Sequence, residues 1–313
     1  MSLPPNDSDS AQQIAAVSLA RVRQLFARPV RCAGSQFLRR EISGRMFERL
    51  SLIKLKPVRL LDAGCGEGED LLPLQQAFPE AECWGMDASV AMLLAAREAS
   101  VASLSGVQKL MLSLFGRHLH KSQGARLACA DFGHLPLPRA SMDMLWSNLA
   151  LHWHPRPHEV MAEWARVLRV DGLLMFSCLG PDSFSELRAA FAESGAEQRV
   201  LPFVDLHDYG DMLVGAGFAT PVMDMEKLTL TYSSTASLLA DVRSFGGNPL
   251  ATQAPGLQGK QQWRRFLQAL ESQRGLDGRL SVSMEVIYGH AFRPQPRVNR
   301  QGESIIRFDA KRG

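Results

Sequence analysis

The sequence predicts an α/β protein built on one mostly parallel β-sheet with helices packed on both faces. Short apolar runs typical of strands alternate with helical patterns from residue 58 to residue 194. The first strand also runs directly into a glycine-rich turn at residues 62–68, a feature of α/β proteins that bind a ligand at a strand end. Strands that alternate with helices pair in parallel through right-handed crossovers.

The first part of the chain supplies most of this alternation. Residues 11–27 and 36–52 carry apolar side chains at helical spacing, and Lys-Pro-Val then leads into the buried strand 58–62. The elements predicted after it are helix 68–78, strand 82–87, helix 89–99, strand 126–130, strand 142–147, helix 156–169, strand 172–178 and helix 183–194. A basic stretch at residues 100–124 interrupts the order, and we interpret it as a peripheral insertion.

The last part of the chain repeats strand and helix signals without an internal repeat. The predicted elements are strand 227–232, helix 235–244, helix 260–273 and a final strand 281–288. We expect residues 1–10 to be disordered, residues 51–293 to form one domain and residues 294–313 to form a tail.

Composition indicates an ordinary globular protein. The 313 residues carry a net charge of +3, but both ends of the chain are basic and the middle is acidic. The five cysteines form no C-x-x-C pair, which suits a reducing compartment. The polar N-terminus lacks the features of a signal peptide, and no stretch is long and apolar enough to span a bilayer. We therefore expect a cytoplasmic protein without a membrane partner.

The glycine-rich turn, Asp62-Ala63-Gly64-Cys65-Gly66-Glu67-Gly68, is the strongest functional signal. Its glycines let the backbone approach a ligand, and the helix that follows offers free N–H groups. The dinucleotide fingerprint G-x-G-x-x-G fails, because Glu69 stands where its third glycine belongs. The carboxylates of Asp62 and Glu67 disfavour a pyrophosphate and favour a cofactor with an ammonium and a sulfonium group.

Two further carboxylates follow the next predicted strands. Asp87 ends the second strand, where it can accept hydrogen bonds from ribose hydroxyls, and Asp131-Phe132 ends the third, where it can contact an adenine ring. Taken alone, a glycine turn is often structural, and an Asp at a strand end is often a helix cap. Three carboxylates at three successive strand ends favour a cofactor site.

The turn resembles the first motif, D-x-G-x-G-x-G, of the class I S-adenosylmethionine-dependent methyltransferases. That resemblance implies a Rossmann-like fold with a seven-stranded sheet, a reversed last strand formed by residues 281–288, and S-adenosylmethionine as cofactor. It also implies that residues 11–50 form a helical lid over the cofactor, and no metal is expected. The cofactor-binding positions implied are Asp62, Gly64, Cys65, Gly66, Asp87, Ala88, Asp131, Phe132, Asn148 and Leu149.

Later segments resemble a narrower family, the malonyl-acyl-carrier-protein O-methyltransferases of biotin synthesis, over about residues 20–293. The segments concerned are Ser147–Trp153, Gly180–Arg188, Phe26 with Arg28, Arg39-Arg40-Glu41 and Asp241-Val242-Arg243. The chain departs from the family in lacking a tyrosine at residues 29–34, and in its insertion 100–124 and its extension after Tyr288. These departures concern the methyl acceptor more than the cofactor.

A malonyl thioester offers an ionised carboxylate that can attack the sulfonium methyl group without a general base, so catalysis needs positioning and exclusion of water. Arg243 and Arg188 are candidates to hold that carboxylate, because a guanidinium matches two oxygens. His152 is a candidate to orient the acceptor or to act as a base. Each of the three also has an ordinary structural interpretation, as a solvated arginine or as a histidine packed beside Trp153.

An acyl carrier protein is acidic, so the basic N-terminal helices are a candidate docking face. The residues concerned are Arg31, Arg39, Arg40, Arg45 and Arg49. The same charges also fit a solvated helix face. We do not expect a nucleic acid partner, because the sequence contains no module typical of nucleic-acid binding.

Alternative functions remain open at this point, among them methylation of a protein side chain or of another small molecule. The segment Asp182–Arg188 and the segments at residues 202–205 and 216–218 also resemble mitochondrial complex I assembly factors that hydroxylate a protein arginine. A third hypothesis is a non-enzymatic assembly chaperone that retains cofactor binding as a relic.

Overall fold

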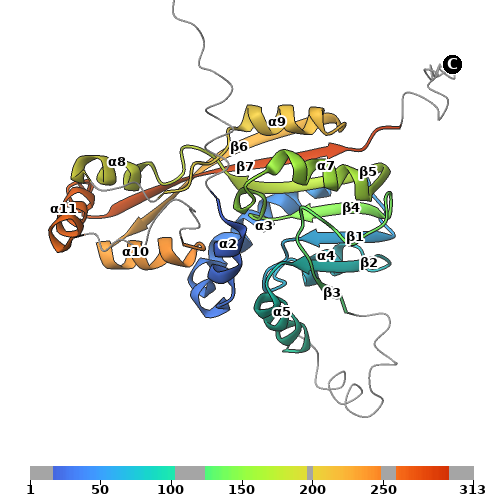
Figure 1. The fold of residues 1–313 in the computed structure, drawn as a ribbon, viewed down its shortest axis with the longest axis horizontal. Helices are drawn as coiled ribbons and strands as arrows, with labels where there is room; N and C mark the ends of the chain where they lie inside the picture. The colour runs from blue at the N-terminus through green and yellow to red at the C-terminus, as the bar shows by residue number, and fades with distance from the viewer. Residues whose placement is uncertain (1–16, 103–123, 196–199, 248–258, 296–313) are drawn as a thin grey trace, which may run out of the picture.

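The structure is a computed structural model, and it describes residues 17–102, 124–195, 200–247 and 259–295. Figure 1 shows one twisted sheet with helices packed on it, and a further group of helices around one end of its two longest strands. The expectations for residues 1–10, for most of the insertion 100–124 and for most of the tail 294–313 lie outside the described residues.

The described strands form one seven-stranded sheet in the order β3-β2-β1-β4-β5-β7-β6. They are β1 (Arg59–Ala63), β2 (Glu82–Asp87), β3 (Arg126–Cys129), β4 (Met142–Ser147), β5 (Leu168–Leu179), β6 (Ala219–Tyr232) and β7 (Leu280–Phe292). Strands β1 to β5 pair in parallel, whereas β7 runs antiparallel to both β5 and β6. The predicted sheet with its reversed last strand is confirmed.

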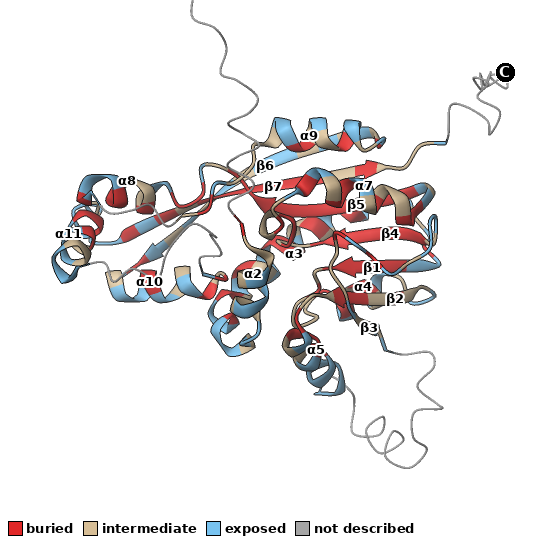
Figure 2. Ribbon diagram, viewed as in Figure 1, coloured by how far each residue is buried: buried red, intermediate tan, exposed pale blue. Residues whose placement is uncertain are grey.

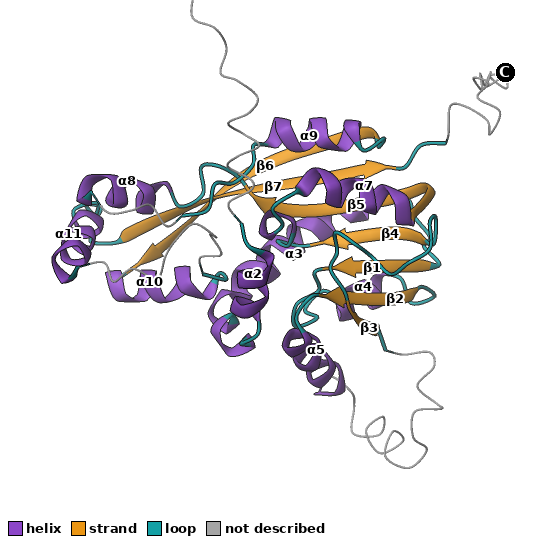
Figure 3. Ribbon diagram, in the orientation of Figure 1, coloured by secondary structure: helices purple, strands orange, loops and turns teal. Residues whose placement is uncertain are grey.

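Helices cover both faces of this sheet (Figure 3). The α-helices described are α2 (Leu19–Phe26), α3 (Gln36–Ser51), α4 (Leu71–Ala77), α5 (Val90–Ala102), α7 (Pro157–Val167), α8 (Ser185–Ser194), α9 (Leu206–Gly215), α10 (Thr235–Ser244) and α11 (Lys260–Glu271). Three short 3-10 turns connect some of them: η1 (Pro29–Arg31), η2 (Ala33–Ser35) and η4 (Leu151–Trp153). No helix in the described ranges is both long and apolar enough to cross a membrane.

Two apolar clusters lie on opposite faces of the sheet, because successive strand side chains point to opposite sides. Leu60 and Trp146 belong to the cluster that packs with α3, α4, α8, α10 and α11, whereas Leu61 and Leu145 belong to the cluster that packs with α7 and α9. Figure 2 shows the central strands buried along most of their length and the outer surfaces of the helices exposed. Both apolar clusters therefore pack against the same sheet, one on each face.

Several predicted boundaries were wrong at the far edge of the sheet. Strand β6 begins at Ala219 rather than at residue 227, and the sequence analysis missed α9 entirely. Helix α9 buries only Tyr209 and Leu213 and is capped by Asp205, whose carboxylate accepts a hydrogen bond from the His207 N–H. In β6 partly buried positions alternate with exposed ones, so no apolar run marks its first half.

The N-terminal segment divides into a core part and a pocket-facing part. Helix α3 buries Leu38, Ile42, Met46 and Leu50 in the main cluster, whereas α2 has no buried residue. The predicted helix at residues 11–27 is described only from Leu19 to Phe26. A lid movement of residues 11–50 stays a prediction.

Candidate cofactor and acceptor pocket

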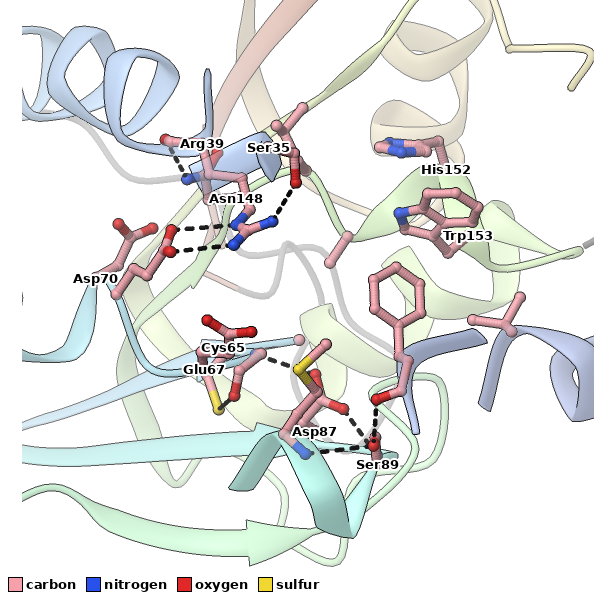
Figure 4. A pocket seen from close by; sticks show the side chains of 18 of the residues that line it. Ser35, Arg39, Cys65, Glu67, Asp70, Asp87, Ser89, Asn148, His152 and Trp153 are labelled. Carbon is pink, nitrogen blue, oxygen red and sulfur yellow. Dashed lines mark hydrogen bonds and ion pairs between the residues drawn. The ribbon is translucent and has the colours of Figure 1, made fainter. Parts of the chain in front are cut away.

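A pocket opens at the carboxyl ends of β1, β2 and β4, where open α/β sheets bind their ligands. Helix α2 and turn η2 line one side, and the segment after α10 contributes Phe245. Figure 4 shows Asp87 and Ser89 in one part of the pocket, Arg39 and Asp70 in another, and His152 beside Trp153 in a third. The described residues contain no group of three or more His, Cys, Asp or Glu side chains suited to hold a metal ion.

Most of the predicted cofactor-binding positions line this pocket. They are Asp62, Gly64, Cys65, Gly66, Asp87, Ala88, Phe132, Asn148 and Leu149. Asp131 lies beside the pocket and does not line it: its Oδ1 accepts a hydrogen bond from the Gly133 N–H, and its Oδ2 pairs with Arg23 of α2 at 3.4 Å. The fold therefore brings residues from β1, β2 and β4 and the segment after β3 to one place.

Gly64 allows the turn after β1 to pass close to the loop after β4. Its φ of +80° is a conformation that residues with a side chain rarely adopt. A Cβ atom at Gly64 would lie 2.5 Å from the Cβ of Ala150, so any side chain there would force the two loops apart. The turn stays narrow because this position is glycine.

Asp87 is held by backbone donors at the end of β2. Its Oδ2 accepts from the Gly66 N–H at 3.0 Å and its Oδ1 from the Ser89 N–H at 2.7 Å. Burial raises the pKa of this carboxyl group, and the two N–H donors oppose that shift. The carboxylate is thereby fixed in orientation at the pocket wall, with acceptor capacity left for a ligand hydroxyl.

Asp62 is a buried carboxylate that lacks a protein donor. It is 2% exposed and lines the pocket, and no hydrogen bond joins its side chain to any described residue. Burial first, and then the nearby Asp70 and Asp87, raise its pKa well above the ordinary range for an aspartate. An ionised carboxylate in this position requires a cationic partner in the pocket.

Arg39 is a pocket residue to which the sequence analysis gave no cofactor role. Its guanidinium forms a two-bond pair with Glu69, at 3.1 Å from Nε and 3.0 Å from Nη2, and also donates to the Cys32 carbonyl. Its own carbonyl accepts from the Asn148 side chain at 3.1 Å. These contacts fasten α3 to the glycine-rich turn and to the loop after β4. The available signal was charge complementarity, since Glu69 directly follows the turn.

Asp70 is a second residue that the sequence analysis missed. Its fully buried carboxylate accepts from the Ser43 hydroxyl at 2.6 Å and from the Trp146 indole N–H at 2.8 Å. Burial raises its pKa, and these hydrogen bonds lower it. Asp70 therefore connects α3, the start of α4 and β4 behind the pocket.

The part of the pocket away from Asp87 is mostly apolar. Leu179, Phe245 and Met284 line it together with His152 and Trp153. The His152 Nδ1 accepts a hydrogen bond from the Leu179 N–H at 3.4 Å, so the ring proton belongs on Nε2. Burial lowers the pKa of His152 to about 3. The imidazole is therefore neutral at physiological pH and is suited to donate a hydrogen bond through Nε2.

The structure does not bring Arg188 or Arg243 into the pocket lining. The half-buried guanidinium of Arg188 turns back onto its own loop, where it donates to the carbonyl oxygens of Pro181 and Ser183. Arg243, in the last turn of α10, is exposed. Neither arginine is positioned to hold a carboxylate in this pocket.

Three of the five arginines predicted as a docking face have acidic partners. Arg39 pairs with Glu69, Arg45 with Glu226 at 2.8 Å, and Arg49 with Asp224 at 2.5 Å. The Arg49 guanidinium also lies 4.0 Å from the centre of the Tyr288 ring. The side of α3 that carries Arg45 and Arg49 therefore faces β6 and β7. Arg31 and Arg40 stay exposed.

Comparison with known proteins identifies the class of protein to which this fold and pocket belong. A family model described as a methyltransferase domain matches residues 61–176. The fold is similar to that of the YcgJ protein of Bacillus subtilis, with a TM-score of 0.54, 16% identity, and coverage of 82% of this chain and 100% of that one. The protein is a class I methyltransferase that uses S-adenosylmethionine.

Curated relatives narrow the class to one family. The malonyl-[acyl-carrier protein] O-methyltransferase of Laribacter hongkongensis is 44% identical over 92% of this chain and 95% of its own length. The protein of the same name from Gallionella capsiferriformans is 45% identical over 93% of this chain and 96% of its own. The chain belongs to the malonyl-[acyl-carrier protein] O-methyltransferase family.

Proposed function

We propose that this protein transfers a methyl group from S-adenosylmethionine to the free carboxylate of malonyl-acyl carrier protein, a step of biotin synthesis. The observation that carries the proposal is the 44–45% identity to two relatives of that name over nearly the whole of both chains. A cytoplasmic location is part of the same proposal. The alternatives of an arginine hydroxylase or an assembly chaperone have no comparable support among these relatives.

The cofactor fits the pocket chemically. Asp62 is a buried carboxylate without a protein donor, and the ammonium group of the cofactor would supply one. We assign the ribose hydroxyls to Asp87, the adenine ring to Phe132 with Ala88, and close backbone approach to Gly64, Cys65 and Gly66. Asn148 and Leu149 complete the proposed cofactor site. When bound, S-adenosylmethionine supplies an electrophilic methyl group.

The acceptor part of the pocket suits a nucleophile that is already ionised. A malonyl carboxylate needs no base at neutral pH, and a histidine with a pKa near 3 is too weak a base to deprotonate an alcohol or an ammonium group. We therefore assign to His152 the role of a hydrogen-bond donor that orients the acceptor. The apolar surfaces of Leu179, Phe245 and Met284 exclude water around it.

The geometry changes the earlier hypothesis for the carboxylate anchor. Arg188 is occupied by backbone carbonyls, and Arg243 is exposed, so we do not assign either of them to the reacting carboxylate. In their place we propose that the His152 Nε2–H donates a hydrogen bond to the acceptor carboxylate. This assignment needs no movement of α8 or α10.

The test is methylation of malonyl-acyl carrier protein by the purified protein, with acetyl-acyl carrier protein as the control. We expect mass spectrometry to show one added methyl group on the malonyl species and none on the acetyl species, which lacks the free carboxylate. Cofactor binding without methylation of the malonyl species would overturn the proposed acceptor and leave the cofactor assignment intact.

A further inference from the structure

The N-terminal segment bridges two elements on opposite sides of the pocket. On one side, the Ser89 hydroxyl donates to the Phe26 carbonyl at 2.9 Å, which ties the end of α2 to the segment before α5. On the other side, the Ser35 hydroxyl donates to the Ser244 carbonyl at 3.0 Å, which ties η2 to the end of α10. Phe26 and Ser35 line the pocket, so residues 27–34 connect two parts of its lining.

Three exposed arginines lie on this bridge and at its attachment to α10. Arg28 directly precedes η1, and Arg31 is the last residue of η1. Arg243 immediately precedes Ser244, which contacts η2. Within the described ranges, no acidic side chain forms an ion pair or a hydrogen bond with any of the three. We refer to Arg28, Arg31 and Arg243 as the arginine rim.

The two arginines of the bridge flank an exposed apolar side chain. Val30 is 88% exposed in η1, between Arg28 and Arg31. An apolar residue flanked by unpaired cations is suited to an interface in which a small apolar contact is enclosed by charge complementarity. The binding of an acidic protein would bury Val30 and neutralise the arginines in one step.

The arginines of the rim differ in this respect from three arginines of the adjoining α3. Arg39, Arg45 and Arg49 on the adjoining α3 are each neutralised by an acidic residue of this chain. Inside the pocket the charge is negative, with Asp62, Glu67 and Asp87 on the wall. The three arginines of the rim do not line the pocket, so their positive charge is not part of the wall that surrounds the cofactor site.

We propose that the arginine rim, with Val30 at its centre, is the surface on which the acidic acyl carrier protein docks. This inference rests on the proposed function and adds the location of the partner. A carrier protein bound there stands over the mouth between α2 and α10, so its thioester arm can enter toward His152 and Phe245. Unpaired cations at the entrance also accelerate encounters with an acidic partner.

The test compares two malonyl substrates that differ in the carrier. Malonyl-acyl carrier protein contacts the rim, whereas malonyl-pantetheine has neither the protein nor a phosphate and reaches only the pocket. The double variant Arg28→Glu with Arg31→Glu reverses the charge of the bridge. The matched control, Lys54→Glu with Lys56→Glu, makes the same change of charge at exposed positions before the amino end of β1, whereas the pocket lies at the carboxyl end of that strand.

We expect the rim variant to lose ~10-fold or more of kcat/KM with malonyl-acyl carrier protein, because charge reversal removes steering and adds repulsion. With malonyl-pantetheine it should match the unmodified protein, and the control variant should retain its activity with both substrates. The loss should shrink at high salt. Replacing Arg243 by Glu should add to the loss.

Two outcomes separate this inference from the function it rests on. Equal loss in the rim and control variants, or no loss in either, would overturn the docking surface while leaving the enzyme assignment intact. Failure of the unmodified protein to methylate either malonyl substrate would instead overturn the proposed function.

Discussion

At the residue scale, Asp62 links cofactor binding to pH. Because burial raises its pKa, the folded protein without ligand holds this proton more tightly than the unfolded chain does. The contribution of Asp62 to stability is therefore present at low pH and is lost as pH rises through the raised pKa. A cationic ligand prefers the ionised form, so its affinity should increase over that same interval.

We expect calorimetry with S-adenosylhomocysteine to show binding that strengthens as pH rises above the range in which an exposed aspartate titrates. Asp62→Asn should weaken binding ~10- to 100-fold at neutral pH, the usual effect of losing a charged hydrogen bond, and should make the pH dependence shallower. Asp211→Asn, at an exposed position of α9, is the control. An unchanged pH slope in the Asp62 variant would rule out this carboxylate as the titrating group.

His152 gives a second prediction at this scale. Since its pKa is about 3, kcat at saturating substrates should show no inflection near pH 6.5 that depends on this residue. His152→Ala should lower kcat ~10- to 100-fold without weakening cofactor binding, and His152→Gln, which keeps an N–H donor, should recover part of that loss. A decline in kcat below pH 6.5 that disappears in His152→Gln would instead identify a general base.

More of the positions predicted to bind the cofactor line the pocket than of those predicted to hold the acceptor. Asp62, Gly64 and Asp87 lie in or directly after short strands, so their meeting at one edge follows from a parallel sheet. The orientation of Arg188 depends on the carbonyls of its own loop, which no residue pattern records. Arg39 joins Glu69 across 30 positions, and such a pairing becomes visible only in the fold.

At the element scale, the strongest predictions concern strands buried on both faces. Strand β4 is buried along its whole length and was predicted at its observed boundaries. Strand β6 lies at the sheet edge and alternates, and α9 covers the sheet with only two buried side chains, so neither produces a long apolar pattern. Peripheral elements are specified by tertiary contacts more than by local sequence.

The segment after α10 supports a prediction about the pocket mouth. Gly246 has a φ of +117°, and a Cβ atom there would lie 2.5 Å from the Trp153 ring and 3.0 Å from the Phe26 ring. Gly217 also has a positive φ, of +85°, but a Cβ atom there would meet nothing within 4 Å. Substitutions at these two glycines therefore distinguish the effect of backbone strain alone from the effect of strain combined with a steric clash.

We expect both Gly246→Ala and Gly217→Ala to lower the melting temperature, because alanine is strained at positive φ by about 1 kcal/mol. Only Gly246→Ala should also lower cofactor affinity and methyl transfer, because it pushes apart the contact between Phe26 and Trp153, which both line the pocket. Equal activity of the two variants in the folded state would show that this contact has no part in forming the site.

At the scale of the whole molecule, one sheet unites both apolar clusters and also presents the pocket. Trp146 belongs to the cluster on one face and Trp164 to the cluster on the other, and both are fully buried. The pocket residues Asp62 and Asp87 end strands of the same sheet. Ligand binding at the strand ends should therefore stabilise both faces together.

This coupling predicts a cofactor-dependent shift in thermal unfolding. A ligand at 100 times its Kd stabilises the folded state by about 2.7 kcal/mol, which corresponds to a rise of roughly 4 °C in a chain of this size. The fluorescence of single-tryptophan variants that retain either Trp146 or Trp164 should report the same midpoint and the same rise. Asp87→Ala should abolish the rise, since it removes the carboxylate assigned to the ribose, whereas Asp211→Asn should preserve it. A rise seen by Trp146 alone would mean that the two faces of the sheet unfold separately.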